Sequence, residues 1–304
     1  MPETVSEKQQ LEVLITGASS GIGLLTAVEL ARRGHRVFAS MRNTAKAQAL
    51  QDKANSAGVS VEVVELDVTS TSSVTAAVNQ ILVNAGRLDV VVNNAATATI
   101  GPLEFSTDAE IENIFNTNVM GPIRVIRAVL PAMRRQGAGR IVNISSGSAH
   151  TRTGVRLMSL YASSKAALHT LTFDLNKELA PLGIRLVLVE GGVGGASKIN
   201  DDLLERVDTF DSENSPYSVA ERIAAAQMRG LMSSISDGSA TARMIADACT
   251  IRDVPARFPP EAQRPLDALR RLSDQDFLKL CALEDLDRTL NRNGLSKSPW
   301  GITG

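Results

Sequence analysis

The chain has 304 residues, of which 43% are hydrophobic and 21% are charged, and its formal net charge is −1. This composition is typical of a globular protein with a sizeable core, and it gives no electrostatic reason to expect nucleic acid or an anionic membrane as a partner. No apolar run is long enough to span a bilayer, and the segment "MPETVSEKQQ" lacks the basic and apolar regions of a signal peptide. Cys249 and Cys281 have no metal-type spacing, so we expect a cytoplasmic protein without a metal site.

Short apolar segments alternate with helical patterns through the first two thirds of the chain. Strands are predicted at residues 11–16, 35–40, 59–66, 88–93, 139–145 and 184–190, and helices are predicted to begin near Ile22, Thr44, Ser72, Thr107 and Leu160. The strands are almost continuously apolar, which is typical of parallel strands covered by helices on both faces. The sequence therefore predicts an α/β fold, a single doubly wound Rossmann-type parallel sheet flanked by helices.

The regular alternation ends near Gly194. Residues 194–216 are polar and rich in turn formers, and helices are predicted for "PYSVAERIAAAQMRGLM" and for residues 239–250. We expect one domain over residues 1–304. In it, residues 10–193 form the dinucleotide-binding and catalytic core, and residues 194–304 form a helical C-terminal extension whose first part, residues 194–235, acts as a lid over the substrate.

The glycine-rich stretch "TGASSGIG" follows the first predicted strand and opens the first helix. In a sheet of this kind the first strand-to-helix turn faces a ligand, and the helix N-terminal amides favour negative charge. The spacing differs from the G-x-G-x-x-G fingerprint of dinucleotide sites, and a tight turn without a ligand is the alternative. The residues predicted to hold a dinucleotide here are Gly17, Ser19, Ser20, Gly21, Ile22 and Gly23.

Polar residues also follow the next predicted strands. Asp67 comes after the third strand and can accept from an adenine amino group, or it can cap the helix that follows. Asn94 and Ala95 come after the fourth strand and can pack beside the adenosine. The second strand ends without an acid but with Arg42, which can pair with a ribose 2′-phosphate or be merely solvated. NADP(H) is therefore preferred over NAD(H).

The segment "YASSKAAL" places Tyr161 and Lys165 four residues apart, on one face of a helix. The ordinary pKa of a phenol is about 10, and a neighbouring ammonium is expected to lower it and make Tyr161 an acid or base near neutral pH. Upstream, "GRIVNISS" brings Ser145 and Ser146 to a strand end, where a hydroxyl can bond a substrate carbonyl.

With these stretches, and with "LDVT", "NNA" and "NTNVMGP", residues 10–193 resemble the short-chain dehydrogenase/reductase family, most closely its hydroxysteroid- and retinol-dehydrogenase-like branch. The resemblance implies hydride transfer between a nicotinamide and a carbonyl or alcohol carbon. Tyr161 would be the proton donor or acceptor, Lys165 would lower its pKa and bind ribose, Ser146 would orient the substrate oxygen, and Asn118 would help hold a water. It also implies cofactor contacts from Val68 and Val193.

Three departures from the family pattern stand out. Ala96 replaces the usual glycine after "NNA", and "EGGVGGAS" replaces the family's Pro-Gly after the sixth strand, so a more mobile loop is expected there. The segment "GSAHTRTGVRLMSL" is longer than usual, so two serines are candidates for the catalytic serine. Counting back from Tyr161 by the commonest family spacing gives Ser148, whereas alignment of the strand gives Ser146. We favour Ser146.

The sequence thus predicts an NADP(H)-dependent carbonyl reductase or alcohol dehydrogenase that acts on a mostly apolar small molecule. The resemblance further suggests a homodimer or homotetramer paired through helices near residues 107–135 and 160–180. Two alternatives remain open. One is a non-catalytic NADP-binding regulator, and the other is an epimerase or dehydratase, for which His150 or Glu190 would supply the additional acid or base.

Overall fold

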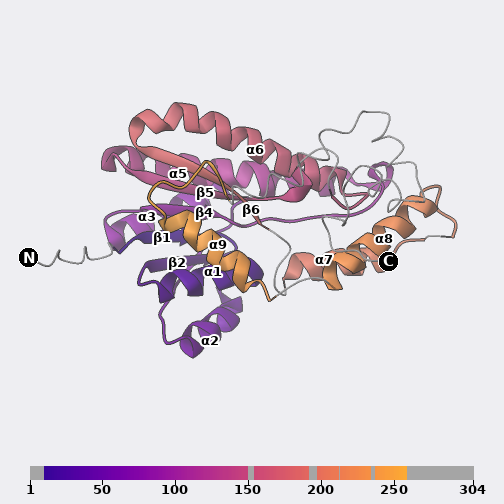
Figure 1. Ribbon diagram of the computed structural model, residues 1–304, viewed down its shortest axis with the longest axis horizontal. Coiled ribbons are helices and arrows are strands. Elements are labelled where there is room, and N and C mark those ends of the chain that lie inside the picture. The colour runs from indigo at the N-terminus through magenta and orange to yellow at the C-terminus, as the bar shows by residue number, and fades with distance from the viewer. Residues whose placement is uncertain (1–9, 150–153, 192–196, 212, 234–236, 259–304) are drawn as a thin grey trace, which may run out of the picture.

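In the computed structural model, residues 10–149, 154–191, 197–211, 213–233 and 237–258 are described. Their strands form one parallel sheet in the order β3-β2-β1-β4-β5-β6-β7 (Figure 1). The strands are β1 (Glu12–Ile15), β2 (Arg36–Met41), β3 (Glu62–Glu65), β4 (Val90–Asn93), β5 (Gly139–Ser146), β6 (Ile184–Gly191) and β7 (Arg257–Phe258). The predicted α/β class is therefore confirmed. Because the strand order reverses between β1 and β4, a crevice for a ligand is expected beyond their carboxyl ends.

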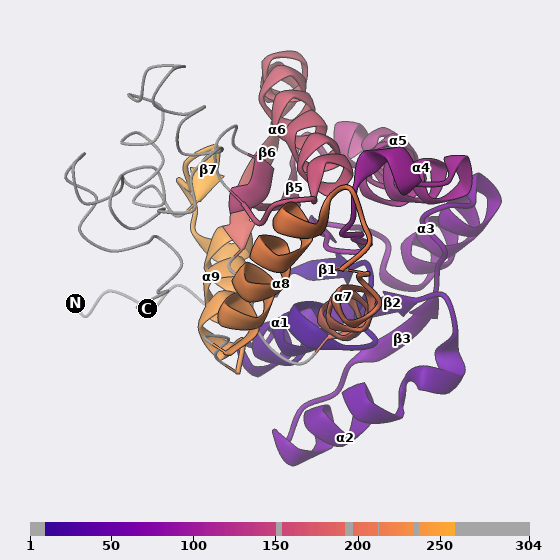
Figure 2. The same ribbon diagram turned by 90° about the vertical axis from the view of Figure 1, so that its right-hand side faces the viewer.

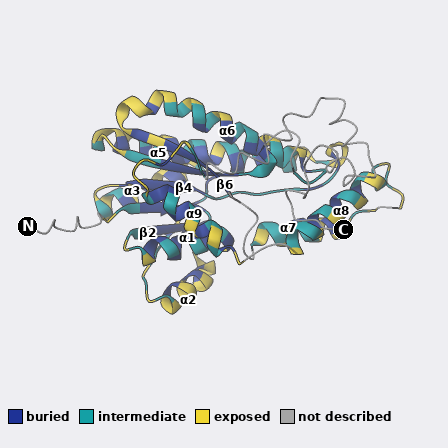
Figure 3. Ribbon diagram, viewed as in Figure 1, coloured by how far each residue is buried: buried dark blue, intermediate teal, exposed yellow. Residues whose placement is uncertain are grey.

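Helices cover both faces of this sheet (Figures 1 and 2). One face carries α1 (Gly21–Arg32), α2 (Gln48–Ser56) and α9 (Ser239–Thr250), and the other carries α3 (Thr71–Ala85), α4 (Asp108–Phe115), α5 (Gly121–Gln136) and α6 (Ser159–Leu179). Two buried apolar clusters fill these interfaces (Figure 3). This explains the continuously apolar strands, since both of their faces are buried.

The helix predicted to begin near Thr107 changes its geometry part-way along. Thr107 caps α4 in a capping box with Glu110, and α4 then passes into η3, a π-helical turn over Asn116–Met120, before α5 begins. Turns of this kind occur often at functional sites. Here the turn contains the predicted site residue Asn118.

Two elements differ from the sequence prediction. Residues 194–216 were expected to be turn-rich, but Lys198–Asp208 form helix α7, with Ser197 as its N-cap. The many charges of this segment conceal an apolar stripe on which Leu203 and Val207 are buried. Strand β7 was not predicted, because two residues carry no periodic signal.

Helices α7 and α8 (Ser218–Ser233) lie together at the carboxyl end of the sheet, in front of the strand ends in Figure 2. We call this pair the cap. A third apolar cluster lies beneath it and includes Leu203, Met228 and, from the loop before α6, Met158. The cap and the loop that leads into α6 thus form a small apolar core together, separate from the two clusters that cover the sheet.

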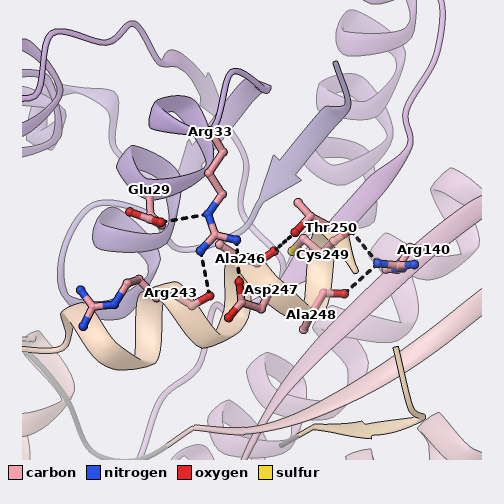
Figure 4. A network of polar contacts seen from close by, with 9 residues as sticks. All are labelled: Glu29, Arg33, Arg140, Arg243, Ala246, Asp247, Ala248, Cys249 and Thr250. Atoms are coloured by element: carbon pink, nitrogen blue, oxygen red, sulfur yellow. Dashed lines mark hydrogen bonds and ion pairs between the residues drawn. The ribbon is translucent and has the colours of Figure 1, made fainter. Parts of the chain in front are cut away.

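Two arginines fix α9 to the rest of the fold (Figure 4). Arg33 bonds Glu29 at 2.9 Å and Asp247 at 2.7 Å, so it ties α1 to α9. Arg140, on β5, donates to the carbonyl oxygens of Ala248, Cys249 and Arg252 at 3.0, 2.8 and 3.2 Å. Because the Ala248 and Cys249 carbonyls lie in the last turn of α9, a cation there is favoured by the helix dipole as well as by hydrogen bonding.

Within the described part of the chain, no helix is both long and apolar enough to cross a membrane. The same residues contain no grouping of histidine, cysteine, aspartate and glutamate that could hold a metal ion.

Candidate active site

A cavity of about 520 Å³ opens at the carboxyl end of the sheet, between the strand ends and the cap. Its wall runs from the glycine turn, through the ends of β2, β3 and β4, to Tyr161 and Lys165 on α6. The cap closes the remaining side with the apolar Leu203, Met228 and Met232 and, at the start of α7, with the polar Lys198, Asn200 and Asp202. Most of the predicted site residues therefore meet around one space.

The glycine turn is held in place by the residues that directly follow the neighbouring strand β4. The side-chain amide of Asn94 donates to the carbonyl oxygens of Thr16 and Gly17 at 2.9 and 3.0 Å. The Thr16 hydroxyl accepts from the backbone N–H groups of Asn94 and Ala95. Gly17 has a φ of 69°, and a Cβ there would lie 2.7 Å from Ala95 Cα. A Cβ at Gly23 would lie 2.4 Å from Asn94 Nδ2. Within the segment "NNA", Asn94 and Ala95 therefore hold the glycine turn in place.

The N-terminus of α1 opens toward this cavity. Ser20 is its N-cap residue but makes no side-chain cap, and the first turn contains no acid. Ser19, Ser20 and Ile22 line the cavity together with Gly17 and Gly23, whereas Gly21 does not. The first amides of a helix lack partners within it, so an uncapped N-terminus at a cavity fits an anionic group such as a pyrophosphate.

The end of β2 carries no carboxylate. Ser40 is buried and donates to the Ile15 carbonyl at 3.1 Å, Met41 is buried, and the exposed Arg42 lies on the cavity wall. Among the described residues, Arg42 makes no ion pair. An unpaired guanidinium beside an open space fits a phosphate.

Asp67 and Val68 line the cavity after β3. Asp67 Oδ1 accepts from the Thr69 amide at 2.9 Å and from the Thr69 hydroxyl at 2.7 Å. The alternative role of Asp67 as a helix cap is wrong, because Ser70 caps α3 through the Ser73 amide. Asp67 instead fixes its own turn, so its carboxylate is already oriented at the cavity wall.

Tyr161 lies on the first turn of α6 and on the cavity wall. Burial raises the pKa of its phenol above the ordinary value of 10, and a hydrogen bond with Ser146 acts in the opposite direction. Ser148 also lines the cavity, and its amide donates to Ser146 Oγ at 3.2 Å. The structure thus joins Ser146 to Tyr161, while the catalytic role of either serine remains a prediction.

Lys165 is 4% exposed, and its Nζ donates to the Ile144 carbonyl at 3.0 Å. Burial lowers the pKa of this amine from 10.5 to about 8. The ammonium lies 5.8 Å from the centre of the Tyr161 ring. Loss of solvation dominates at both groups and raises the pKa of the phenol, so the expected lowering of the Tyr161 pKa by Lys165 stays a prediction.

Asn118 lies behind the cavity wall and is 1% exposed. Its side chain exchanges two 2.8 Å hydrogen bonds with the backbone of Thr97 and donates to Ser164 Oγ at 3.0 Å. Ser164 in turn donates to the Tyr161 carbonyl at 2.7 Å. The Asn118 amide therefore braces the helix that carries Tyr161, a role that its position in "NTNV" does not reveal.

The structure adds a buried ion pair that the sequence could not show. Glu190, at the end of β6 and on the cavity wall, pairs with Arg257 Nε of β7 at 3.1 Å and lies 3.9 Å from His169 Nε2. Arg257 also stacks over the Phe173 ring at 5.4 Å. Two further candidates from the sequence, His150 and Val193, lie outside the described residues, as does Cys281.

The family model described as short chain dehydrogenase matches residues 12–206. The chain belongs to the short-chain dehydrogenase family. Retinol dehydrogenase 8 from Bos taurus is 40% identical over 203 residues, which cover 66% of this chain and 64% of the relative. Estradiol 17-beta-dehydrogenase 1 from Rattus norvegicus is 33% identical over 281 residues, covering 90% of this chain and 77% of the relative. These relatives place this short-chain dehydrogenase in the hydroxysteroid and retinol dehydrogenase branch.

Solved structures also support membership of the short-chain dehydrogenase family. A short-chain dehydrogenase from Streptomyces avermitilis has a TM-score of 0.69 at 30% identity, with 93% of this chain and 99% of that chain covered. A metagenomic short-chain oxidoreductase in complex with NADP has a TM-score of 0.56 at 30% identity, with 63% and 86% covered. The matched part of the chain spans 64% of the bovine retinol dehydrogenase 8 and 58% of the human one.

Proposed function

We propose that this short-chain dehydrogenase is an NADPH-dependent reductase of ketones or aldehydes, able to run in reverse as an alcohol dehydrogenase. The observation that carries the proposal is the continuity of the cavity. One space extends from the uncapped N-terminus of α1 to the hydrogen-bonded pair of Tyr161 and Ser146. A phosphate-binding helix end and a proton-donating phenol on one cavity are what hydride transfer to a carbonyl requires.

The cofactor would be held by the residues around the first half of the cavity. The glycine turn and the α1 N-terminus fit the pyrophosphate, and Asp67 with Ala95 would hold the adenine. Arg42 would pair with the 2′-phosphate, which favours NADP(H) over NAD(H). When bound, this cofactor supplies the hydride; the protein supplies its orientation and the proton.

Tyr161 would donate the proton to the substrate oxygen. Because burial raises the pKa of the phenol, Tyr161 keeps its proton at neutral pH, which suits reduction. Ser146 would hold the same oxygen, and Lys165 would bind ribose and replace the lost proton. Since the Asn118 amide is engaged by Thr97 and Ser164, any water that Asn118 holds for this relay would be held by its main-chain carbonyl.

The substrate would be mostly apolar. Beyond Tyr161 the cavity is walled by Met158, Leu203, Met228 and Met232, which are flexible or branched apolar side chains suited to an irregular hydrophobic molecule. An epimerase or dehydratase would need a further acid or base near Tyr161. The described candidate, Glu190, is paired with Arg257, so we do not extend the proposal to those reactions.

We also propose a symmetric homo-oligomer, which light scattering would test.

The decisive experiment follows NADPH and NADH absorbance over a panel of ketones, aldehydes and quinones. The proposal expects oxidation of NADPH that is lost in Tyr161→Phe and in Ser146→Ala but retained in Ser148→Ala. It also expects Arg42→Ala to raise the KM for NADPH with little effect on NADH, while Arg32→Ala, an exposed arginine outside the cavity, changes neither. Tight NADPH binding without any turnover would instead favour a regulator.

A further inference from the structure

A strained turn precedes the helix that carries Tyr161. Leu157 has a φ of 61°, and among the described residues no other non-glycine residue has a positive φ. A leucine is disfavoured in this conformation, so the surrounding structure must hold it there. Met158, the N-cap residue of α6, contributes no side-chain cap. The conformation that leads into Tyr161 therefore depends on contacts from outside the turn.

Two hydrogen bonds hold this turn from distant parts of the chain. The Leu157 carbonyl accepts from the Gly101 amide at 2.8 Å. The Arg156 amide donates to Gln227 Oε1 at 3.0 Å, across 71 positions of sequence. Because Gln227 lies on α8, this second bond attaches the cap directly to the turn.

Apolar packing joins the same two parts of the molecule. Leu157, Met158 and Tyr161 belong to or pack against the cap's own cluster, to which Leu203 and Met228 also belong. Met228 directly follows Gln227 and lines the cavity beside Met158. The cap is thus a side wall for the substrate and, at the same time, a support for the phenol.

We propose that Gln227 is a positioning residue for Tyr161, which through the Arg156 amide holds the strained turn and so sets where the phenol meets Ser146 and the substrate. The inference rests on the proposed function, since it assigns a residue to the same site. It also explains why an amide side chain points from the cap toward a backbone N–H beside the active site. Loss of the bond would let the turn relax and displace the first turn of α6.

The test compares Gln227→Ala with Gln227→Glu, which keeps an oxygen acceptor for the Arg156 amide. In Gln227→Ala, hydrogen exchange in the peptide 154–161 should rise, and kcat should fall roughly 10- to 100-fold, as a small misplacement of a catalytic group does. The KM for NADPH should stay unchanged, because Gln227 does not line the cavity. Gln227→Glu should restore both readouts.

A second readout does not need turnover. The chain has two tyrosines, so Tyr217→Phe leaves Tyr161 as its only phenol, whose ionisation is then followed by ultraviolet absorbance. In that background Gln227→Ala should move the Tyr161 pKa back toward 10, since a loosened turn admits water. Arg229→Ala is the matched control: it removes an exposed 2.7 Å pair with Asp208 within the cap and should alter none of these values.

The proposal is overturned if Gln227→Ala leaves exchange and the phenol pKa unchanged, or if exchange rises while kcat stays the same. It is equally overturned if Arg229→Ala causes the same losses, because the effect would then be one of cap stability. A wild type that turns over no carbonyl compound would refute the proposed function instead, and the exchange and absorbance readouts would still decide whether Gln227 positions Tyr161.

Discussion

Replacing Lys165 by methionine should make the protein more stable while abolishing the proposed reductase activity. Lys165 is almost fully buried, and burial lowers the pKa of its amine from 10.5 to about 8. Since one pKa unit corresponds to about 1.4 kcal/mol, keeping this amine charged costs the folded state about 3 kcal/mol at pH 7. The bond to the Ile144 carbonyl, worth about 1 kcal/mol, is also lost. Lys165→Met should therefore gain about 2 kcal/mol in free energy of unfolding.

The pH dependence identifies the cause. Between about pH 8 and pH 10.5 the folded wild type binds fewer protons than the unfolded chain, because the folded-state pKa of Lys165 is depressed. Its stability therefore rises with pH in this window relative to Lys165→Met. The advantage of the methionine variant should be full below pH 8 and should vanish by about pH 10.5.

Urea unfolding followed by circular dichroism at pH 7 and pH 10 measures the difference. Lys177→Met is the control on the same helix, since Lys177 is exposed and, among the residues the structure describes, its one ion pair is with Asp174. This substitution should change stability by less than about 0.5 kcal/mol at either pH. A Lys165→Met protein that is less stable than wild type at pH 7, or whose difference does not change with pH, would refute the reasoning.

Three more predictions follow from contacts described above. Gly23→Ala should abolish NADPH binding, measured by fluorescence titration, because its Cβ would displace the Asn94 amide; wild-type affinity would contradict this. Arg140→Ala should lower the free energy of unfolding by roughly 2–4 kcal/mol, since it leaves the carbonyls of Ala248, Cys249 and Arg252 without their donor. Burial raises the pKa of the Cys249 thiol to about 12. In a Cys281→Ser variant, Cys249 should therefore react with a thiol reagent only after unfolding, and labelling of the native protein would contradict this.

The sheet could be predicted from sequence because its signal is local and repeated. Most of the six predicted segments are runs of apolar residues, and helices of ordinary length separate one strand from the next. Helix α7 was not predicted because most of its residues are charged or polar. Its apolar face, formed by Leu203 and Val207, is recognised only from their burial in the folded structure. Strand β7 depends on pairing with β6 and carries too few residues to have a pattern.

The candidate site divides in the same way. The sequence could predict that Gly17, Tyr161 and Lys165 lie at the site, because Gly17 is in the first strand-to-helix turn and a four-residue spacing puts Tyr161 and Lys165 on one helix face. All three line the cavity. The sequence could not show that Lys165 is bound to a carbonyl and has a depressed pKa, since those depend on how α6 packs on β5. Nor could it reveal Gln227, whose partner lies 71 residues away and is a backbone amide.

The brace between Asn94 and the glycine turn bears on how quickly and how tightly a nucleotide can be taken up. Four hydrogen bonds within the chain, among Thr16, Gly17, Asn94 and Ala95, hold the turn. A binding loop that is already ordered loses little conformational entropy when it is occupied. Under the proposed function, a nucleotide would therefore leave and be replaced without the loop having to refold. Its affinity for this half of the cavity would depend on its contacts with the loop and not on the cost of ordering the loop.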